Sequence, residues 1–281
     1  MSIHIARHSY GKSNVRVSRI LREGSHNHFI ELTVSISLEG DFEAAYTNAD
    51  NRLVIPTDTM KNTVYILAQR HGLRSIESIS VNLCEHFLKE YSQIQVVTVD
   101  IEQKPWRPIR IDETPHAHTF VGSGSERWQC IARAEHHNLR LQSGLHGLQG
   151  LMSTASGFRD FYRDDYTTLA DTEDRILATT IAADWPVSDT SQDWSTIRQT
   201  IRACLLKSFA IHTSASGQHS IRELAKHTLD RCPEIFEISI SCPNQHHLLV
   251  ELSPFGISNE NELFVPTEEP YGLIGATVSR A

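Results

Sequence analysis

The chain has 281 residues, of which 40% are hydrophobic and 21% charged, with a formal net charge of -8. This composition is typical of a globular protein, and the length accommodates one large domain or two of ordinary size. The acidic balance argues against nucleic-acid binding, which relies on clustered Lys and Arg, so we expect a small-molecule ligand. Because no apolar run approaches the roughly 20 residues of a membrane span, we expect no membrane partner.

The cysteines and the first residues indicate the cellular compartment. The five cysteines include no Cys-x-x-Cys pair, which favours buried thiols over a disulfide scaffold or a zinc site. The opening stretch MSIHIARHSYGK lacks the apolar segment of a secretory signal. We therefore expect a cytoplasmic protein.

The first half begins with a polar turn around Lys12 and then shows strand signals. Apolar residues alternate in residues 14–21 and 29–40, and the stretch between them, REGSHNH, predicts a hairpin loop. Two helices should follow, over residues 58–71 and 75–91, where apolar residues recur at three- and four-residue spacing. We expect Asp58 to cap the first of them.

Strand signals return at residues 94–106 and 118–134, and the second half repeats the order of the first. There, strands are predicted at 137–145 and 175–185 and helices at 193–210 and 220–229, followed by strands at 234–241, 247–255 and 272–280. The repeated order predicts an α+β fold of two tandem domains, residues 1–135 and 136–281. Each domain should be an antiparallel β-sheet with two helices on one face.

Local motifs for metals, nucleotides and hydrolysis are weak. The 16 histidines include His-x-His pairs at His26 and His116, but no spacing of the His-Glu-x-x-His kind. A His-x-His pair on one strand can bind metal, so this alternative stays open. The stretch GSGSER at Gly122 lies between strand signals instead of opening a helix, which argues against a phosphate loop. No serine nucleophile motif is present.

Polar clusters at the ends of the predicted elements carry a resemblance to a known family. The stretches are YGKSNVRV, PTDTMKNT, PHAHTF, RDDYTTLADTEDRIL, SASGQHS, PNQHH and YGLIGATVSR, in this order along the chain. Together they resemble urate oxidase, the cofactor-free uricase of the tunnelling-fold group, over nearly the whole length. The resemblance implies oxidation of urate by dioxygen and water to 5-hydroxyisourate and hydrogen peroxide, with no metal and no organic cofactor.

The resemblance assigns proton transfer to three residues and purine binding to seven. Lys12, Thr57 and His246 match the family's proton relay, and burial of the Lys12 amine would lower its pKa from the usual value of about 10.4. Substrate contacts are implied for Asp58 through its backbone, Phe158 by ring stacking, Leu169 as pocket lining, and Arg175, Gly217, Gln218 and Asn244.

The chemistry of these residue types suits a flat purine anion. The guanidinium fork of Arg175 and the amide of Gln218 can each make two-point contacts with a ring edge. Asn244 matches the residue that holds dioxygen, or the water that replaces it. Gly217 departs from the family, where a bulkier aliphatic residue is common; its backbone N–H can still serve, but the pocket wall should be less rigid.

The resemblance also implies an assembly. The family forms homotetramers with active sites at subunit interfaces. Lys12 and Thr57 of one chain would therefore serve a site to which the neighbouring chain contributes Phe158, Arg175, Gln218, Asn244 and His246. The chain ends in SRA instead of a peroxisomal Ser-Lys-Leu type signal, which again favours a cytoplasmic location. Two alternatives remain: a metal-dependent pterin or purine hydrolase on the same fold, and a non-catalytic purine-binding protein.

Overall fold

The computed structural model describes residues 3–73, 75–136, 138–267 and 269–280. The chain forms two compact units, the first made of residues 1–144 and 186–196 and the second of residues 145–185 and 197–281. The predicted domain boundary, between residues 135 and 136, lies in the turn between two strands and stays a prediction. His137, beside that boundary, lies outside the described residues.

The first unit starts with a long hairpin formed by β1 (Tyr10–Glu23) and β2 (His26–Gly40). The turn between them is shorter than predicted, because the strands stay paired up to Glu23 and His26. Gly24 adopts a φ of 60°, a conformation that favours glycine, and it allows this tight reversal. The predicted hairpin is therefore confirmed, with longer strands.

Helices α1 (Glu43–Thr47), α2 (Thr57–His71) and α3 (Ile76–Glu90) follow. Helix α2 buries Met60, Val64 and Leu67, the apolar stripe that the sequence predicted. It ends at Gly72, which has a φ of 77°. Helix α3 begins at the N-cap Ser75, whose side chain accepts from two backbone N–H groups of the first turn. Both predicted helices are confirmed.

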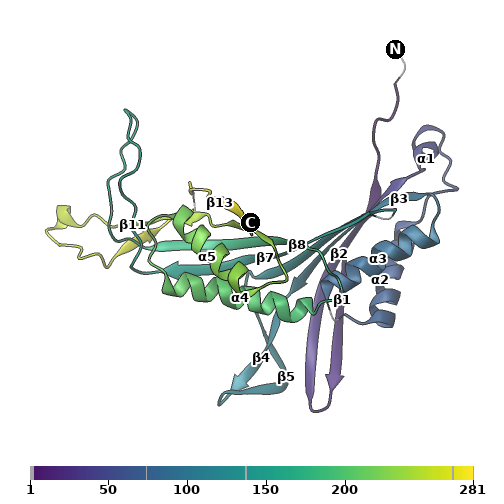
Figure 1. Cartoon of the computed structure of the whole chain (residues 1–281), viewed down its shortest axis with the longest axis horizontal. Helices are drawn as coiled ribbons and strands as arrows, with labels where there is room; N and C mark the ends of the chain where they lie inside the picture. The colour runs from purple at the N-terminus through teal and green to yellow at the C-terminus, as the bar shows by residue number, and fades with distance from the viewer. Residues whose placement is uncertain (1–2, 74, 137, 268, 281) are drawn as a thin grey trace. The chain divides into compact units, whose positions relative to one another are not determined.

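Strands β3 (Ile94–Lys104) and β6 (Arg127–Glu135) continue the first unit's sheet, in the order β1-β2-β3-β6. Helices α2 and α3 pack against β1, β3 and β6 (Figure 1). Between β3 and β6 the chain forms a separate hairpin of β4 (Trp106–Ile111) and β5 (Thr114–Gly122). No strand was predicted from the sequence at β4, and β5 and β6 were predicted as one strand over residues 118–134.

The second unit has the same plan. Its sheet contains parts of β7 (Asn138–Met152) and β8 (Leu177–Val187), with β9 (Glu237–Ser241) and β13 (Gly275–Ser279), in the order β7-β8-β9-β13. Helices α4 (Trp194–Ile211) and α5 (Gly217–Arg231) lie along one face of this sheet (Figure 1). Each unit is thus an antiparallel sheet covered on one face by two main helices, as predicted.

Shorter elements lie at the end of the second unit. Strand β10 (Asn244–Gln245) pairs with β8, and β11 (His247–Leu249) pairs with β12 (Phe264–Pro266). The prediction of one strand over residues 247–255 is wrong after Leu249, because a 3₁₀ turn, η1 (Ser253–Phe255), follows. Pro254 at the start of that turn lacks the N–H that a strand ladder would use.

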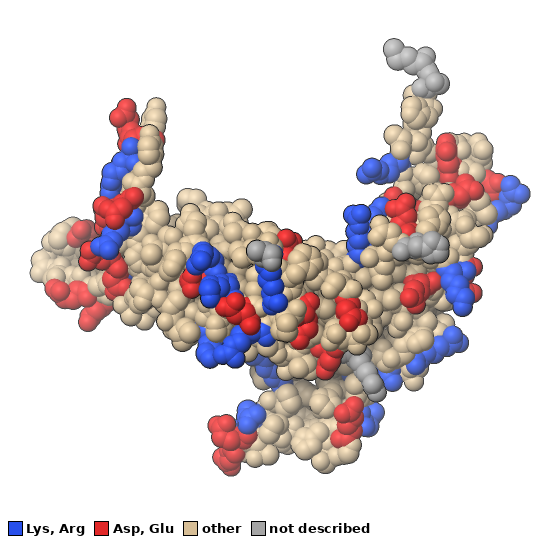
Figure 2. All heavy atoms as spheres, in the orientation of Figure 1, with Lys and Arg blue, Asp and Glu red and all other residues tan. Residues whose placement is uncertain are grey.

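Burial follows the expected pattern along the chain. All five cysteines are free and buried, which confirms their predicted role as small apolar side chains. No helix within the described ranges is long and apolar enough to cross a membrane. On the face shown in Figure 2, acidic and basic side chains are interspersed.

Candidate active site

The site residues of the first unit begin with Lys12. It lies in β1 opposite Ile36 of β2, not in the polar turn that the sequence predicted. The register of the hairpin shifts between Lys12 and Val15, where Asn14 has a φ of 57°. Such a bulge changes the direction of the side chains beside it. In a single chain the Lys12 side chain is half-buried.

Thr57 and Asp58 form the first turn of α2. The helix is capped at Pro56, so the prediction that Asp58 caps it is wrong. The Asp58 carboxylate instead accepts a hydrogen bond from Lys61 Nζ at 2.5 Å, on the exposed side of the helix. This bond lowers the pKa of Asp58, and the charge of Lys12 adds to the effect. Strand β1, which carries Lys12, packs against α2.

Tyr10 joins these two elements. Its hydroxyl accepts the Ile55 N–H at 2.8 Å, which ties β1, two residues before Lys12, to the chain two residues before Thr57. Burial is the main cause of the raised pKa of Tyr10. The intervening Gly11 allows close strand contact, because a Cβ there would lie 1.9 Å from the Ile36 carbonyl oxygen. The sequence analysis missed Tyr10, although it precedes Lys12 in the YGK motif.

In the second unit, backbone pairing places Phe158 beside Arg175. Phe158 exchanges two backbone hydrogen bonds with Thr172, at 2.8 and 2.9 Å, and the Arg175 N–H donates to the Ser156 carbonyl at 2.8 Å. As a result, the Arg175 guanidinium carbon lies 5.3 Å from the centre of the Phe158 ring. The Phe158 ring is also stacked on Phe161, with centres 4.8 Å apart.

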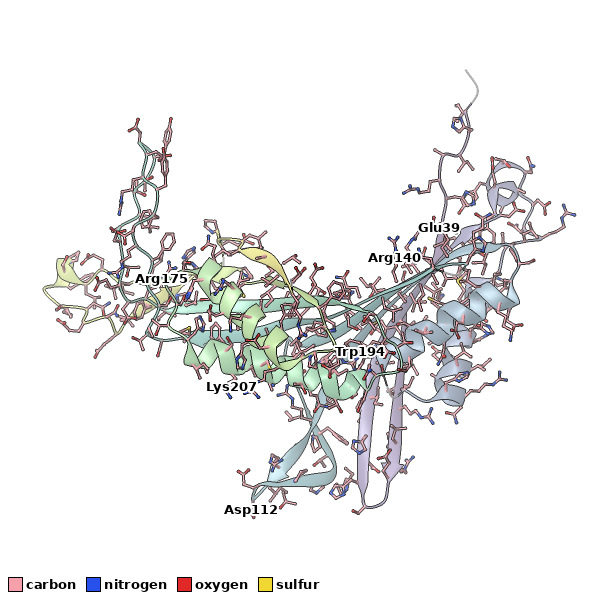
Figure 3. The ribbon with its side chains drawn as sticks, viewed as in Figure 1. Glu39, Asp112, Arg140, Arg175, Trp194 and Lys207 are labelled. Carbon is pink, nitrogen blue, oxygen red and sulfur yellow. The ribbon has the colours of Figure 1, made fainter. Side chains whose placement is uncertain are left out.

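Arg175 keeps an unused donor. Its Nε is buried and has no hydrogen-bond partner among the described residues. Burial lowers the pKa of the guanidinium, since the charge is partly removed from water. Figure 3 shows Arg175 close to the start of β8. A buried N–H without an acceptor is costly, so this donor is suited to a bound acceptor.

Gly217 and Gln218 open helix α5. Ser216 is the N-cap, and its hydroxyl accepts the His219 N–H at 3.1 Å. Gln218 is exposed, whereas Gly217 is buried. A Cβ on Gly217 would lie 2.4 Å from Cδ1 of Ile274. The Ile274 side chain therefore fills the space that a larger residue 217 would take.

Asn244 and His246 form the third cluster. The Asn244 N–H donates to the Gly272 carbonyl at 2.8 Å, and the side chain is buried, with 8% of the residue exposed. Its Nδ2 lies 3.3 Å from His246 Nδ1. Because an amide nitrogen only donates, His246 Nδ1 accepts, and in the neutral ring Nε2 carries the proton. This contact favours the tautomer with the proton on Nε2.

Seven of the predicted site residues thus form three clusters within the units, while Leu169, Gly217 and Gln218 lie outside these clusters. Leu169 is 53% exposed. The clusters are Lys12 with Thr57 and Asp58, Phe158 with Arg175, and Asn244 with His246.

Ser156 and Ser214 were also missed, although they pair the segment that carries Phe158 with the start of α5. The signal was present in the sequence, because the tripeptide Ala-Ser-Gly occurs at residues 155–157 and again at 215–217.

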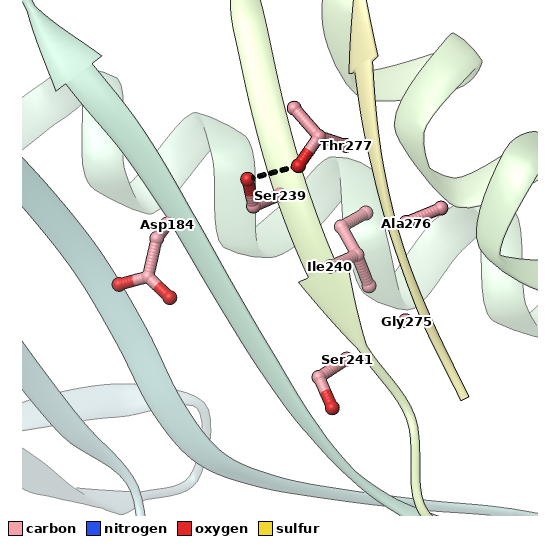
Figure 4. Close-up of a pocket in the computed structure, with 7 residues that line it drawn as sticks. All are labelled: Asp184, Ser239, Ile240, Ser241, Gly275, Ala276 and Thr277. Carbon is pink, nitrogen blue, oxygen red and sulfur yellow. Dashed lines mark hydrogen bonds between the residues drawn. The ribbon is translucent and has the colours of Figure 1, made fainter. Parts of the chain in front are cut away.

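Two further observations concern possible ligands. A hollow of about 450 Å³ lies along β9 and β13 and is lined by Asp184, Ser239, Ser241 and Thr277 among others (Figure 4). None of the predicted site residues lines it. His116 and His118 have ring centres 4.6 Å apart, but no group of three potential metal ligands lies together in the part of the chain that the structure describes.

Two tandem units, each an antiparallel sheet with helices on one face, define a tunnelling-fold protein. A family model described as Uricase matches residues 8–132 and 141–275, and the chain belongs to the uricase family. The uricase of Arthrobacter globiformis is 38% identical over 276 residues, covering 98% of this chain and 90% of that protein. The uricase of Danio rerio is 34% identical, and the match covers 99% of this chain and 96% of that protein.

Solved structures agree with these sequence matches. The crystal structure of the Arthrobacter globiformis uricase superposes with a TM-score of 0.91 and covers 100% of this chain and 96% of that chain. A crystal structure of urate oxidase from Bacillus sp. TB-90, 25% identical, gives a TM-score of 0.84 and covers 97% and 100%. The expected family and fold are confirmed.

Proposed function

We propose that the chain is a urate oxidase. The observation that carries this proposal is the Arg175 guanidinium beside the Phe158 ring, with a buried Nε donor that no described group accepts. A flat anionic ring that stacks on Phe158 would supply the missing acceptor at its edge. Urate has this shape and charge, and the named relatives are uricases.

The reaction transfers two electrons from urate to dioxygen. Urate, dioxygen and water give 5-hydroxyisourate and hydrogen peroxide, and the oxygen atom added at C5 comes from water. The protein needs no metal or organic cofactor if it stabilises a more deprotonated urate, which is electron-rich enough to reduce dioxygen itself. Its work is proton transfer and electrostatic stabilisation.

We assign the proton transfers to Lys12, Thr57 and His246, as the resemblance implies. The packing of β1, which carries Lys12, against α2, which begins at Thr57, and the contact of His246 with Asn244 support this assignment. Asn244, bonded to His246, is assigned to dioxygen or to the attacking water. Leu169 and Gln218, together with the backbone of Asp58 and Gly217, complete substrate binding.

Because Leu169 and Gln218 are exposed in the single chain, we further propose that the site is completed at a subunit interface of a homotetramer. Lys12 and Thr57 would then face the Phe158, Arg175 and His246 of a neighbouring chain. We also propose a cytoplasmic location.

Urate oxidation by the purified protein tests this function. We expect loss of urate absorbance, consumption of dioxygen and formation of hydrogen peroxide in equal amounts, and Arg175→Ala serves as the inactive control. Peroxide-free consumption of a purine, lost on metal removal, would instead indicate the hydrolase alternative. Urate binding without turnover would indicate a purine-binding protein.

A further inference from the structure

Two segments that resemble each other in sequence run side by side in the second unit. Residues 154–158 read TASGF and residues 214–218 read SASGQ, so one ends at Phe158 and the other at Gln218. The residue pair Ser156 and Ser214 forms a parallel β-bridge. The Ser214 N–H donates to the Ala155 carbonyl at 2.9 Å, and the Ser214 carbonyl accepts the Gly157 N–H at 2.8 Å.

The relative position of these segments decides the geometry of purine binding. Phe158 lies two residues after the bridge on one side, and Gln218 lies four residues after it on the other. The Phe158 ring, which would stack on the purine, and the Gln218 amide, which would bond to the purine edge, must keep a fixed distance from each other. Hydrogen bonds weaken steeply when their geometry changes. Whatever holds Ser214 in place therefore affects substrate binding.

Ser214 is held by a chain of side-chain hydrogen bonds that starts at His212. The His212 ring lies at the end of α4, with Nδ1 2.8 Å from the Ser208 carbonyl oxygen and Nε2 2.8 Å from Ser220 Oγ. Ser220 Oγ in turn lies 2.8 Å from Ser214 Oγ. The chain thus connects the end of α4, the first turns of α5 and the bridge to the segment of Phe158.

Donor and acceptor roles can be assigned along this chain. A carbonyl oxygen only accepts, so His212 Nδ1 carries a proton and donates to Ser208. In the neutral ring Nε2 is then an acceptor within reach of the Ser220 hydroxyl. Ser220 Oγ is also the donor toward Ser214 Oγ, so its single proton is shared between the two contacts, and the Ser214 hydroxyl donates to the Ser216 carbonyl at 3.2 Å. A phenylalanine of similar size could make none of these bonds.

The two serine hydroxyls in this chain of hydrogen bonds are buried. Ser214 and Ser220 are 1% and 3% exposed, so water cannot replace a lost hydrogen-bond partner. Both hydroxyls also lie 3.2 Å from the Ser216 carbonyl oxygen, so loss of the His212 ring leaves each serine a partner within α5 but removes the hydrogen bond that ties them to the end of α4. His212 itself is half-buried, and its ring contacts Ser208, Ser220, Phe209 and His219, none of which is a predicted substrate-binding residue.

We propose that His212 is a positioning residue for purine binding, acting through Ser220 and Ser214 on the spacing of Phe158 and Gln218. This inference rests on the proposed function. His212 does not touch the substrate and takes no part in the oxidation. It sets affinity, so its loss should raise KM and leave kcat nearly unchanged.

Steady-state kinetics and xanthine binding should be compared for wild type, His212→Phe and His212→Gln. We expect His212→Phe to raise the KM for urate and the Kd for xanthine about tenfold, as for loss of one buried hydrogen bond, with kcat within about threefold of wild type. His212→Gln, whose amide can reach Ser220, should recover most of the affinity. His227→Phe, on α5 but outside the chain of bonds, is the matched control and should match wild type.

A second variant and a second readout keep the test decisive. Ser220→Ala breaks the chain with a small change, so it replaces His212→Phe if that variant does not fold. Hydrogen exchange over residues 154–158 should be faster in both variants, because the Gly157 N–H bonds to Ser214. This readout does not depend on activity.

The outcomes separate the two proposals. If wild type neither oxidises urate nor binds xanthine, the proposed function is wrong, and exchange over residues 154–158 still decides the role of His212. If wild type is active but the variants keep wild-type KM, Kd and exchange, the positioning role is wrong while the function stands. A fall in kcat with unchanged KM would also overturn it.

Discussion

At the scale of single residues, the site depends on Arg175. Its guanidinium is partly removed from water, its pKa is lowered by that burial, and its Nε has no partner in the described part of the chain. Removing the guanidinium charge from water costs free energy, and a bound ligand that accepts its hydrogen bonds offsets that cost. The arginine should therefore contribute mainly to binding.

Replacing Arg175 by alanine should weaken xanthine binding by about two orders of magnitude, as expected for a lost charge-assisted bidentate contact. Arg175→Lys should recover little, because an ammonium cannot make the two parallel bonds of the planar fork. Titration calorimetry measures the xanthine affinity of both variants. Arg222→Ala, an exposed arginine paired with Glu223, is the control and should bind as wild type. Equal affinity of Arg175→Ala and wild type would contradict the assignment.

Lys12 is assigned to proton transfer. Lys12→Met keeps the length of the side chain and removes the ammonium, so kcat should fall by roughly 10² to 10⁴, the usual contribution of general acid-base catalysis. Xanthine affinity should change little. Lys89→Met, at the exposed end of α3, is the matched control. If Lys12→Met abolished xanthine binding and kept kcat, the roles of Lys12 and Arg175 would have to be exchanged.

At the scale of elements, the start of α5 is packed against the segment before β13. Ile274 takes the space that a side chain at residue 217 would need, and its carbonyl accepts the Cys242 N–H at 2.8 Å. The space beside Gly217 is thus filled by a side chain from the segment before β13. The sequence-based expectation of a less rigid pocket wall at Gly217 stays a prediction.

Gly217→Val requires the flexible end of the half-buried Ile274 side chain to move, so the cost to the fold should lie at the low end of overpacking, about 1 kcal/mol. The double variant Gly217→Val with Ile274→Ala should recover much of this loss, because the total volume is nearly restored. Thermal unfolding and xanthine affinity measure the coupling. Strictly additive effects of the two substitutions would show that residues 217 and 274 do not share this space.

The sequence predicted the regular elements well where periodicity was strong. The stripe of Met60, Val64 and Leu67 in α2 is buried as expected, because helical spacing alone decides which face an amphipathic helix hides. The predicted cap of α2 is wrong because the helix already begins at Thr57, which places Asp58 inside the first turn instead of at the N-cap position. The β4 strand was missed because Pro105 and Pro108 weaken its strand signal.

The candidate site was predictable only as a set of residue types. The resemblance named Phe158 and Arg175, but their contact depends on pairing with Thr172 and Ser156, which no local pattern encodes. The link from Tyr10 to Ile55 spans 45 positions in the chain, and periodicity carries no information about such pairs. Long-range backbone pairing therefore had to come from the structure.

At the scale of the whole molecule, the proposed chemistry needs no metal. Dialysis against a strong chelator should leave urate oxidation unchanged, because the electrons pass directly from deprotonated urate to dioxygen. The test compares the rate of urate oxidation before and after dialysis, and the metal content of the protein is determined in parallel. Activity that falls and returns on adding copper or zinc would contradict the cofactor-free mechanism and point to the histidine pairs.

The central claim is that one site is assembled from two chains, with Lys12 from one and Arg175 from its neighbour. Lys12→Met and Arg175→Ala chains should each be nearly inactive alone. In a hybrid pair related by a two-fold axis, one site collects both substitutions and the other collects neither. Activity of the hybrid therefore tests the claim directly.

The decisive measurement is the urate oxidation rate of hybrids made by co-expressing the two variants, with their composition confirmed by native mass spectrometry. We expect each hybrid pair to regain about half the activity of a wild-type pair, as independent two-fold sites require. Confirmed hybrids that stay inactive would show that Lys12 and Arg175 of the same chain serve the same site, and the shared site would be wrong.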